Sequence, residues 1–333
     1  MNVTIKRVEV RRSEYTSRDN YSGLTGKLIM NLRTLSYIHI GSGMFRVDVD
    51  MDMVKRFRKL LRTRGFEYAL GREMERAVSL EYFKFIKYGD KVVVPASTIK
   101  GLLRSRLELL FKGTSGSVSS CFSRASRPLG IIPPKGSHGW RHARIWGDVL
   151  FEDRGYPCNP TRSKLVCKVC DIFGAPGLIS RVFIGNFYAE GDIVERKDLP
   201  YGEKLEVVRS NIVFKGEIVF HALKLDEIGL LFIALGADRN GDFVPLLIGK
   251  HKYSNKDFGK IKFEVIDVLI YEYGKQSIPK GIEHEVYERS PNFVRIKSPK
   301  DLIVQAISEA CRKYPDIADS IGFSEAIVRD RKI

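Results

Sequence analysis

The sequence predicts an α+β protein built on a ferredoxin-like sheet with large insertions. The predicted segments follow the order strand, helix, strand and then again strand, helix, strand, which is the order of a split βαβ sheet. A long segment rich in Ser, Gly and Pro interrupts this order and holds four clustered cysteines. No segment of about twenty to fifty residues repeats, so a solenoid or a propeller is not expected.

The first part of the chain combines strands with charged helical segments. Residues 24–40 predict a strand that ends at a turn with two glycines, IHIGSG. Residues 44–90 contain two strongly charged segments of helical pattern, KRFRKLLRTRGF and REMERAVSLEYFKFIKYG. We interpret 44–90 as an insertion that carries a basic helix. A short strand, KVVV at 91–94, follows the insertion and stops at Pro95.

A helix is predicted directly after Pro95. Ser97 is its N-cap candidate, because the hydroxyl can accept a hydrogen bond from the free amides of the first turn. Lys100 and Arg104 are four residues apart and are expected to project together from one face. Since helix N-terminal amides bind anions, this helix start is a predicted anion site. The buried face is predicted from apolar residues at helical spacing, which are Ile99, Leu102, Leu103, Leu107 and Leu110.

The remaining elements continue the alternation of strands and helices. They are a central strand at 178–190, a hairpin at 205–224 turning at Lys215-Gly216, an apolar helix at 225–238, two strands around a Gly- and Lys-containing loop, a strand near 265–272 and a final helix near 300–313.

Composition and charge narrow the class of function. Apolar residues make up 44% of the 333 residues, which is enough for a sizeable core. Lys and Arg number 56 against 40 Asp and Glu, giving a net charge of +16, and such a chain is expected to prefer polyanions. No apolar run long enough for a transmembrane helix is present, and the N-terminus lacks the pattern of a secretory signal. We therefore expect a cytoplasmic nucleic-acid-binding protein with no membrane role.

Four of the five cysteines lie within fifty residues, inside the loop-like stretch 113–177. A CxxC pair places two thiolates at a distance that suits one ion, and tetrahedral zinc needs four such ligands. Cys158, Cys167 and Cys170 supply three of these ligands. Cys121 is the natural fourth, with His138 or His142 as alternatives. Cysteine-rich ligation favours a closed, structural zinc site over a catalytic one. The predicted ligands are Cys121, Cys158, Cys167 and Cys170.

Two glycine-containing motifs are candidates for phosphate contact. The IHIGSG turn lets backbone approach a ligand closely, but a simple tight turn would look the same. The motifs Gly249-Lys250-His251-Lys252 and Gly259-Lys260 place three lysines in a glycine loop between two predicted strands. Such a loop suits phosphate binding or, equally, a solvated basic hairpin. The GxxxxGK[ST] sequence of P-loop NTPases is absent, so that class is rejected.

These motifs together resemble the RAMP superfamily, and the sequence is most similar to the backbone-type subunits of type III CRISPR effector complexes. The resemblance covers residues 24–265, with Ala96 standing where glycine is common in the family. The 44–90 insertion and the tail lie outside it. The motifs that carry it are IHIGSG, VVPASTIKGLLR, CKVCDIFG, ISRVFIGNFY and GKHKYSNKDFGKIKF.

The resemblance implies a modified RNA-recognition fold that packs side by side along a guide RNA, with target RNA and other subunits as partners. It implies a RAMP-type RNA-binding domain at 1–266, with insertions at about 44–90 and 113–177, and a C-terminal extension of a strand and a helix at 267–333. A thumb-like hairpin is expected within 200–224. The implied RNA contacts are His39, Ser42, Ser97, Thr98, Lys100, Arg104, Arg181, Lys250, Lys252 and Lys260.

Some members of that family also cut target RNA with an aspartate that follows the glycine turn and helps a divalent metal. This sequence offers Asp48, Asp50 and Asp52 in VDVDMDM, with Mg or Mn as the implied metal. The alternative is that these carboxylates cap the following helix, where they suit its dipole.

Two further functions compete with the guide-binding subunit. One is a stand-alone CRISPR RNA-processing endonuclease of the same superfamily, for which His39 or His251 could be the general base. The other is a zinc-stapled DNA-binding protein, although no Arg- and Asn-rich recognition helix is visible.

Overall fold

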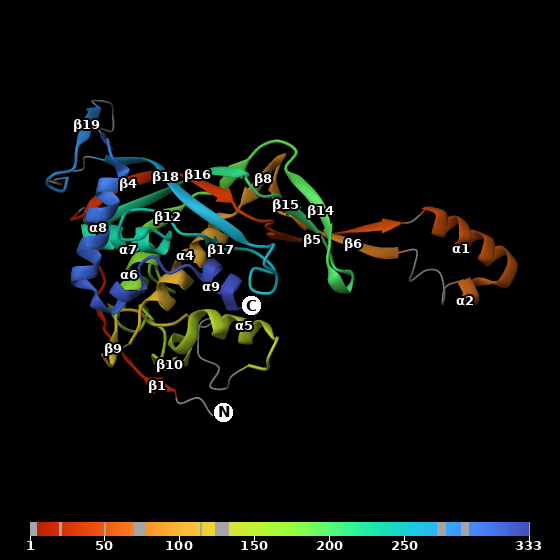
Figure 1. Cartoon of the computed structure of the whole chain (residues 1–333), viewed down its shortest axis with the longest axis horizontal. Coiled ribbons are helices and arrows are strands. Elements are labelled where there is room, and N and C mark those ends of the chain that lie inside the picture. The colour runs from red at the N-terminus through yellow and green to blue at the C-terminus, as the bar shows by residue number, and fades with distance from the viewer. Residues whose placement is uncertain are drawn as a thin grey trace.

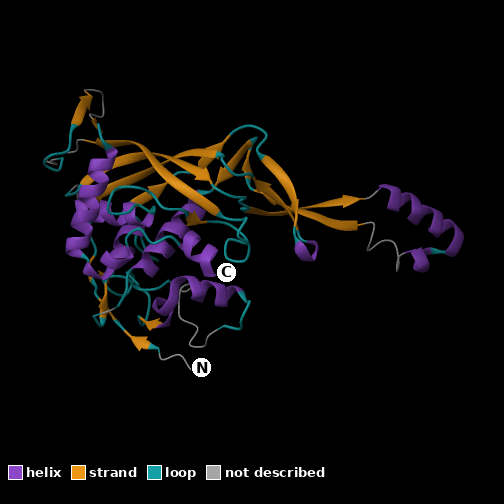
Figure 2. Ribbon diagram, viewed as in Figure 1, coloured by secondary structure: helices purple, strands orange, loops and turns teal. Residues whose placement is uncertain are grey.

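The computed structural model describes residues 5–19, 22–49, 51–69, 78–113, 115–123, 133–271, 278–287 and 293–332. It is a mixed α+β molecule in which a long sheet is covered on one face by helices (Figures 1 and 2). A narrow arm projects from one end of this body and finishes in two helices (Figure 1). The predicted α+β class is confirmed. None of the described helices is both long and apolar enough to cross a lipid bilayer.

The main sheet is built around three long antiparallel strands, β18 (Lys260–Tyr271), β4 (Leu24–Thr34) and β16 (Val213–Leu223). Side chains alternate between the faces of a strand, and every second residue of β4 from Leu28 to Leu32 is fully buried. The helices cover this buried face. The sheet is extended by β20 (Phe293–Ile296) and β19 (His284–Tyr287) at one edge, by β13 (Phe187–Ala189), β8 (Lys91–Val94) and β7 (Lys87–Tyr88) at the other, and by β12 (Val182–Ile184) on β16 and β17 (Leu246–Leu247) on β18.

The helical layer holds the hydrophobic core against the sheet (Figure 2). Helices α7 and α8 touch backbone to backbone, because a Cβ on Gly229 would lie 2.0 Å from the carbonyl oxygen of Ala306. The helices are α4 (Ala96–Leu110), α5 (His138–Trp146), α6 (Lys168–Phe173), α7 (Leu225–Ala234), α8 (Pro299–Lys313) and α9 (Glu325–Lys332), with 3-10 turns η3 (Gly147–Phe151), η4 (Pro200–Gly202) and η5 (Pro315–Ser320).

The N-terminal segment is attached to the cysteine-containing insertion by three short ladders. The stretch 113–177 was expected to be loop-like, but these ladders and two helices give it regular structure. The pairs are β1 (Lys6–Arg7) with β10 (Glu152–Asp153), β2 (Glu9–Val10) with β9 (Ser117–Val118) and β3 (Ser13–Glu14) with β11 (Leu165–Val166).

A second sheet of four strands forms the base of the arm, in the order β14-β15-β6-β5. Its strands β5 and β6 continue outward as a two-stranded ribbon, and α1 and α2 lie at the tip (Figure 1). The bounds are β14 (Val194–Asp198), β15 (Lys204–Val208), β6 (Val78–Phe85), β5 (Gly41–Val49), α1 (Met51–Arg64) and α2 (Phe66–Ala69).

The insertion at 44–90 differs from its predicted structure. Its first charged segment is a helix, as expected, but the second contains strand β6 at 78–85. This segment fits a helical pattern locally, yet β5 and β15 both pair with it, and such pairing overrides a weak local preference.

Three other boundaries were also predicted wrongly. Lys215-Gly216 is not a turn but lies inside β16, opposite Asn31 and Met30 of β4. The predicted strand 178–190 is broken at Gly185-Asn186 into β12 and β13. The expected domain boundary at residue 266 falls within β18, so the tail continues the main sheet and covers it with α8.

Candidate RNA interface and metal site

The start of α4 is open rather than capped by a side chain. Pro95 is the N-cap, so the prediction of Ser97 as the cap was wrong; Pro95 fixes the turn but offers no hydroxyl. The amide of Ala96 donates to Asn186 Oδ1 at 2.8 Å, and those of Thr98 and Ile99 donate to the Pro95 carbonyl. Ser97 is exposed, and its amide and hydroxyl make no hydrogen bond to the described residues.

Lys100 lies in the second turn of α4 and is half-buried. No acidic side chain of the described chain pairs with it, and its pKa is lowered by burial and by the neighbouring Arg104. An unpaired, partly desolvated cation is electrostatically unfavourable, and an anion at this position would relieve the cost. Within the described residues, the predicted anion site at the start of α4 therefore offers two unpaired groups, the Ser97 amide and the Lys100 ammonium.

Arg104 was expected to project beside Lys100, but its guanidinium turns inward. It donates to Glu108 at 2.9 Å, to the Gly174 carbonyl at 2.6 Å and to Cys170 Sγ at 3.2 Å. Burial alone would lower its pKa, but the charges of Cys170 and Glu108 outweigh burial and raise it. Arg104 thus links α4 to the cysteines, and its three guanidinium nitrogens are engaged within the protein rather than turned to the surface.

The four predicted ligands come together, each of them buried, with all sulfur atoms within 4.8 Å of one another. Cys121 Sγ lies 3.6 Å from the sulfurs of both Cys167 and Cys170. These separations are too long for a disulfide and close to the roughly 3.8 Å expected between thiolates around tetrahedral zinc. Cys121 is therefore the fourth member of the cluster, while His138 and His142 lie on α5 against Tyr253.

Local backbone geometry prepares the cysteines for a metal. Cys167 is the N-cap of α6, and its sulfur accepts the Cys170 amide at 3.4 Å. The Cys167 amide in turn donates to Cys158 Sγ at 3.1 Å. Donors directed at sulfur stabilise thiolates, as does the nearby Arg104. Four thiols with such donors could hold a soft divalent metal such as zinc.

The two glycine motifs meet in space. The Lys250 amide donates to the His39 carbonyl at 2.9 Å, and a Cβ on Gly249 would lie 2.4 Å from that carbonyl oxygen. His39 itself is only 2% exposed; its Nδ1 lies 2.7 Å from the Glu206 carbonyl oxygen, and burial lowers its pKa. The His39 side chain is therefore withdrawn from the surface, where RNA would bind.

Most of the other predicted contacts already have partners. Lys250 pairs with Glu203, and its ammonium lies 4.5 Å from the centre of the Phe83 ring. Lys260 pairs with Asp330 at 3.1 Å. Lys252 is the exception, since no acidic side chain within the described residues pairs with it and burial lowers its pKa. Ser42 Oγ is turned back onto the ribbon, 3.3 Å from the Lys84 carbonyl.

Arg329 of α9 holds this glycine loop in place and was missed from the sequence. Its guanidinium is fully buried and donates to four backbone carbonyls of the loop, at distances from 2.6 to 3.1 Å. No sequence motif indicates this role, because the α9 sequence EAIVRDRK has the composition of an ordinary charged helix. The carbonyls belong to Lys252, Asn255, Lys256 and Phe258.

Arg181 was expected to contact RNA but is 0% exposed. Its guanidinium bonds Asp171 at 2.7 Å and Glu227 at 2.8 Å. Although burial opposes ionisation, Arg181 and Lys168 lower the pKa of Glu227 to about 2. The physical role of Arg181 is therefore to neutralise two buried carboxylates between α6 and α7, and no donor is left for a phosphate.

Comparison with known proteins agrees with the motifs. Residues 31–300 match the family model described as the RAMP superfamily. The chain belongs to the RAMP superfamily. No curated protein matches it. Among solved structures it is similar to the crystal structure of Thermofilum pendens Csc2, with 12% identity, a TM-score of 0.40, and coverage of 95% of this chain and 91% of that one.

Asp48 and Asp52, two of the three aspartates proposed for cutting, lie on the arm of this RAMP protein. The backbone of Asp48 is in β5 opposite Ser79, while its carboxylate and the whole of Asp50 lie outside the described residues. Asp52 is 82% exposed in the first turn of α1 and 2.9 Å from Lys55. That position agrees with the alternative in which an acidic side chain complements the helix dipole.

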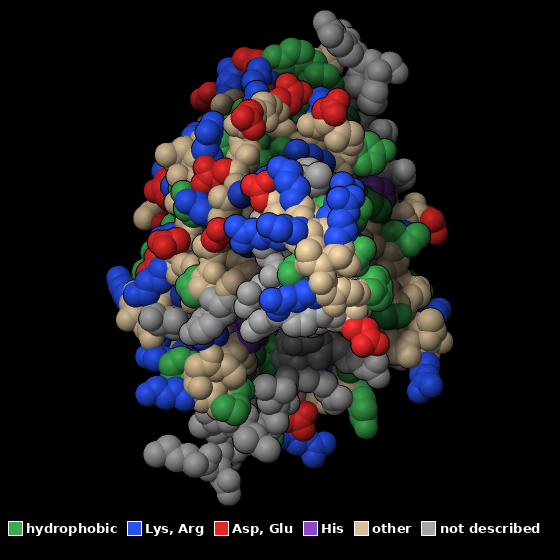
Figure 3. Space-filling model, turned by 90° about the vertical axis from the view of Figure 1, so that its right-hand side faces the viewer, with side chains coloured by type: hydrophobic (Ala, Val, Ile, Leu, Met, Phe, Trp, Pro, Cys, Tyr) green, Lys and Arg blue, Asp and Glu red, His purple; other side chains and the backbone are tan. Residues whose placement is uncertain are grey.

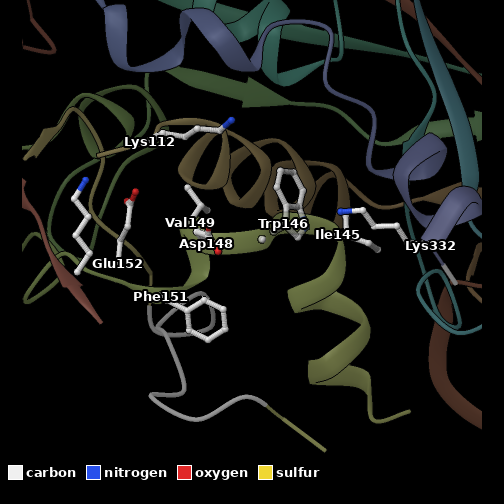
Figure 4. A pocket seen from close by; sticks show the side chains of 10 residues that line it. Lys112, Ile145, Trp146, Asp148, Val149, Phe151, Glu152 and Lys332 are labelled. Atoms are coloured by element: carbon white, nitrogen blue, oxygen red, sulfur yellow. The ribbon is translucent and has the colours of Figure 1, made fainter. Parts of the chain in front are cut away.

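A pocket of about 570 Å³ that the sequence did not predict lies beside α5 and η3 (Figure 4). Trp146 forms part of its wall, and Lys112 and Lys332 point their ammonium groups towards it (Figure 4). Two of its lysines are already bound to carbonyls, Lys6 to Gly113 at 2.7 Å and Lys332 to Arg144 at 3.1 Å. Its cations are thus mostly committed to holding the N- and C-terminal segments on the insertion.

Proposed function

We propose that this RAMP protein is a guide-RNA-binding, backbone-type subunit of a cytoplasmic type III CRISPR interference complex. The observation that carries the proposal is Lys100, a half-buried cation without an acidic partner among the described residues, next to the free amide of Ser97. A phosphate placed there would receive hydrogen bonds from the helix start and neutralise the cation.

Such a site contacts the backbone of a strand rather than its bases. Phosphate contacts fix the register of the protein on the RNA and carry no sequence information. In an RNA-guided complex the target sequence is read by base pairing with the guide. A subunit that holds only the guide backbone leaves the bases free for this pairing. Target RNA and neighbouring subunits are the further partners that this function requires. Our candidate for the thumb is the β14–β15 hairpin at 194–208, which overlaps the expected range 200–224 and has its turn at 199–203, at the end of the second sheet.

Zinc is the metal that we propose for the cysteine cluster. It would tie α6 to Cys121 and Cys158, and through Arg104 it would fix the orientation of α4. When bound, it supplies a permanent positive charge that keeps the four sulfurs deprotonated. The chain's own amides and the Arg104 guanidinium orient those sulfurs.

Cutting of target RNA stays a prediction. It would use one or more of Asp48, Asp50 and Asp52, together with Mg or Mn; the exposed pair of Asp52 with Lys55 does not prevent metal binding. Within the described parts of the chain, the cysteine cluster is the one group of three or more metal-binding side chains within reach of a common ion.

Replacement of Lys100 by Glu tests the proposal. We expect weaker binding of guide-length RNA and a salt dependence shallower by about 0.7 for each lost phosphate contact. Lys280→Glu is the matched control, since Lys280 is exposed and makes no side-chain pair with the described residues. Fluorescence anisotropy between low and high salt measures both quantities. Equal slopes for wild type and Lys100→Glu would contradict the proposal.

RNA that co-purifies from the native host separates the alternatives. Guides of defined length support the interference subunit, whereas bound DNA supports the DNA-binding alternative. Precursor cleavage that disappears in His251→Ala would support the processing endonuclease. His251 is the remaining candidate base, because His39 is buried and bonded to backbone.

A further inference from the structure

The arm carries its helices well away from the body of the protein. Strand β5 has nine residues, so the ribbon extends about 27 Å at the usual rise of a strand. Near its base the ribbon pairs with β15, at Leu205 opposite Phe83, while its outer pairs join only β5 and β6. Helix α1 is therefore displayed at a distance from the start of α4 (Figure 1).

The tip is strongly basic. Between residues 52 and 67 there are six cations and two acids, and all eight side chains are exposed. Figure 3 views the molecule from the end that bears the arm and shows Lys and Arg side chains gathered on this face. The cations are Lys55, Arg56, Arg58, Lys59, Arg62 and Arg64.

Four of these cations share one face of α1. Lys55, Arg58, Lys59 and Arg62 follow the spacing i, i+3, i+4 and i+7, and the row is about 10 Å long. Lys55 is bound to Asp52, but the other three have no acidic partner among the described residues. Like charges at these spacings repel one another, so this face loses stability unless an anion binds to it.

The opposite face of α1 is apolar. Val54, Phe57 and Leu60 are half-buried there, and α1 packs against α2. The apolar face is thus partly used within the tip itself, and the basic face is the one left to the solvent. A membrane-binding helix would instead leave a broad apolar face free.

We propose that the basic face of α1 binds the sugar–phosphate backbone of RNA, as a second contact separate from the start of α4. This inference rests on the proposed function and extends it. The body grips one segment of RNA, and the arm reaches a segment that the body does not touch. Three arginine and lysine side chains in a row of this length match successive phosphates of one RNA strand. A protein partner with scattered carboxylates would not require the cations to lie in a row.

The test neutralises the face without removing the helix. In Arg58→Gln/Lys59→Gln/Arg62→Gln the new side chains are good helix formers, and helicity is checked by circular dichroism. We expect RNA binding to weaken about tenfold or more at low salt, and the salt dependence to become shallower by about 2. The control Arg58→Lys/Arg62→Lys keeps the charge and should retain the slope.

The same assay on full-length protein separates this inference from the function on which it rests. If Lys100→Glu weakens RNA binding and the arm variant does not, the arm inference is overturned and the proposed function stands. If both variants bind like wild type, both fail. Losses that add in the combined variant support both sites. Binding of anionic phospholipid vesicles that depends on the arm, with unchanged RNA affinity, would also overturn the inference.

Discussion

At the scale of single residues, the site depends on cations whose orientation is set by acidic partners, some local in the sequence and some distant. Arg104 and Arg181 were expected at the RNA surface from their positions near the motifs, yet both are turned inward by carboxylates. Asp171 and Glu227 lie ten and forty-six residues from Arg181, so no local pattern could reveal these pairs. Lys100 lies on α4 as the local helical spacing predicted, and no acidic side chain of the described residues pairs with it; its contact with RNA stays a prediction.

Arg329 allows a sharp test of one side chain. Arg329→Lys should destabilise the protein by about 2–4 kcal/mol, because one ammonium cannot serve all four carbonyls, of which that of Phe258 is buried, and a buried carbonyl left unpaired is costly. Urea unfolding measures the loss. Arg331→Lys, an exposed change in the same helix, is the control and should be neutral. Equal stability of the two variants would show that Arg329 does not hold the loop.

At the scale of elements, helices were easier to predict than strands. The apolar spacing that predicted α4 is local, and Ile99, Leu103, Leu107 and Leu110 are indeed buried. The helix expected near 300–313 was also placed correctly, as α8, but it is not the final one because α9 follows it. Strand β6 was missed because its partners lie about thirty residues or more before it and more than a hundred after it. Hydrophobic pattern alone does not record such pairing.

The close contact between the IHIGSG turn and the glycine loop predicts that adding one methyl group at Gly249 destabilises the protein. Gly249→Ala places a Cβ 2.4 Å from the His39 carbonyl oxygen at a φ of +79°, so the two motifs must separate. We expect a loss of roughly 2–3 kcal/mol in unfolding free energy. Gly89 also has a positive φ, but a Cβ there would meet no atom within 4 Å. The loss of unfolding free energy in Gly89→Ala should therefore be smaller, because it reflects backbone strain alone. Equal losses in denaturant unfolding would contradict the close approach.

At the scale of the whole molecule, the cysteine cluster joins segments that are otherwise far apart. The CxxC spacing predicted three ligands and proposed Cys121 as the fourth, and the structure brings all four together. Through Arg104 the cluster also contacts α4, and through Asp171 of α6 it is linked to the N-terminal segment. The sequence could not reveal these two links, because Arg104 and Thr16 reach the cluster only after the chain has folded.

Metal removal should therefore loosen the entire body. We expect about one zinc per chain by metal analysis, and stripping it with a chelator should lower stability on the order of 5 kcal/mol or more. Cys167→Ser should lose the metal, whereas Cys311→Ser should keep it because Cys311 lies outside the cluster. Thermal unfolding with and without chelator measures the difference. A metal-free wild type, purified without chelators, would refute the zinc assignment.

The strand order also has a consequence for how the protein is made. Strand β4 is among the earliest elements of the chain, yet both of its neighbours, β16 and β18, are translated about two hundred residues later. At ordinary ribosomal speed, the apolar side of β4 waits on the order of tens of seconds for a partner. During synthesis this segment is the natural target for a chaperone, and slower elongation before residue 213 would prolong its exposure to aggregation.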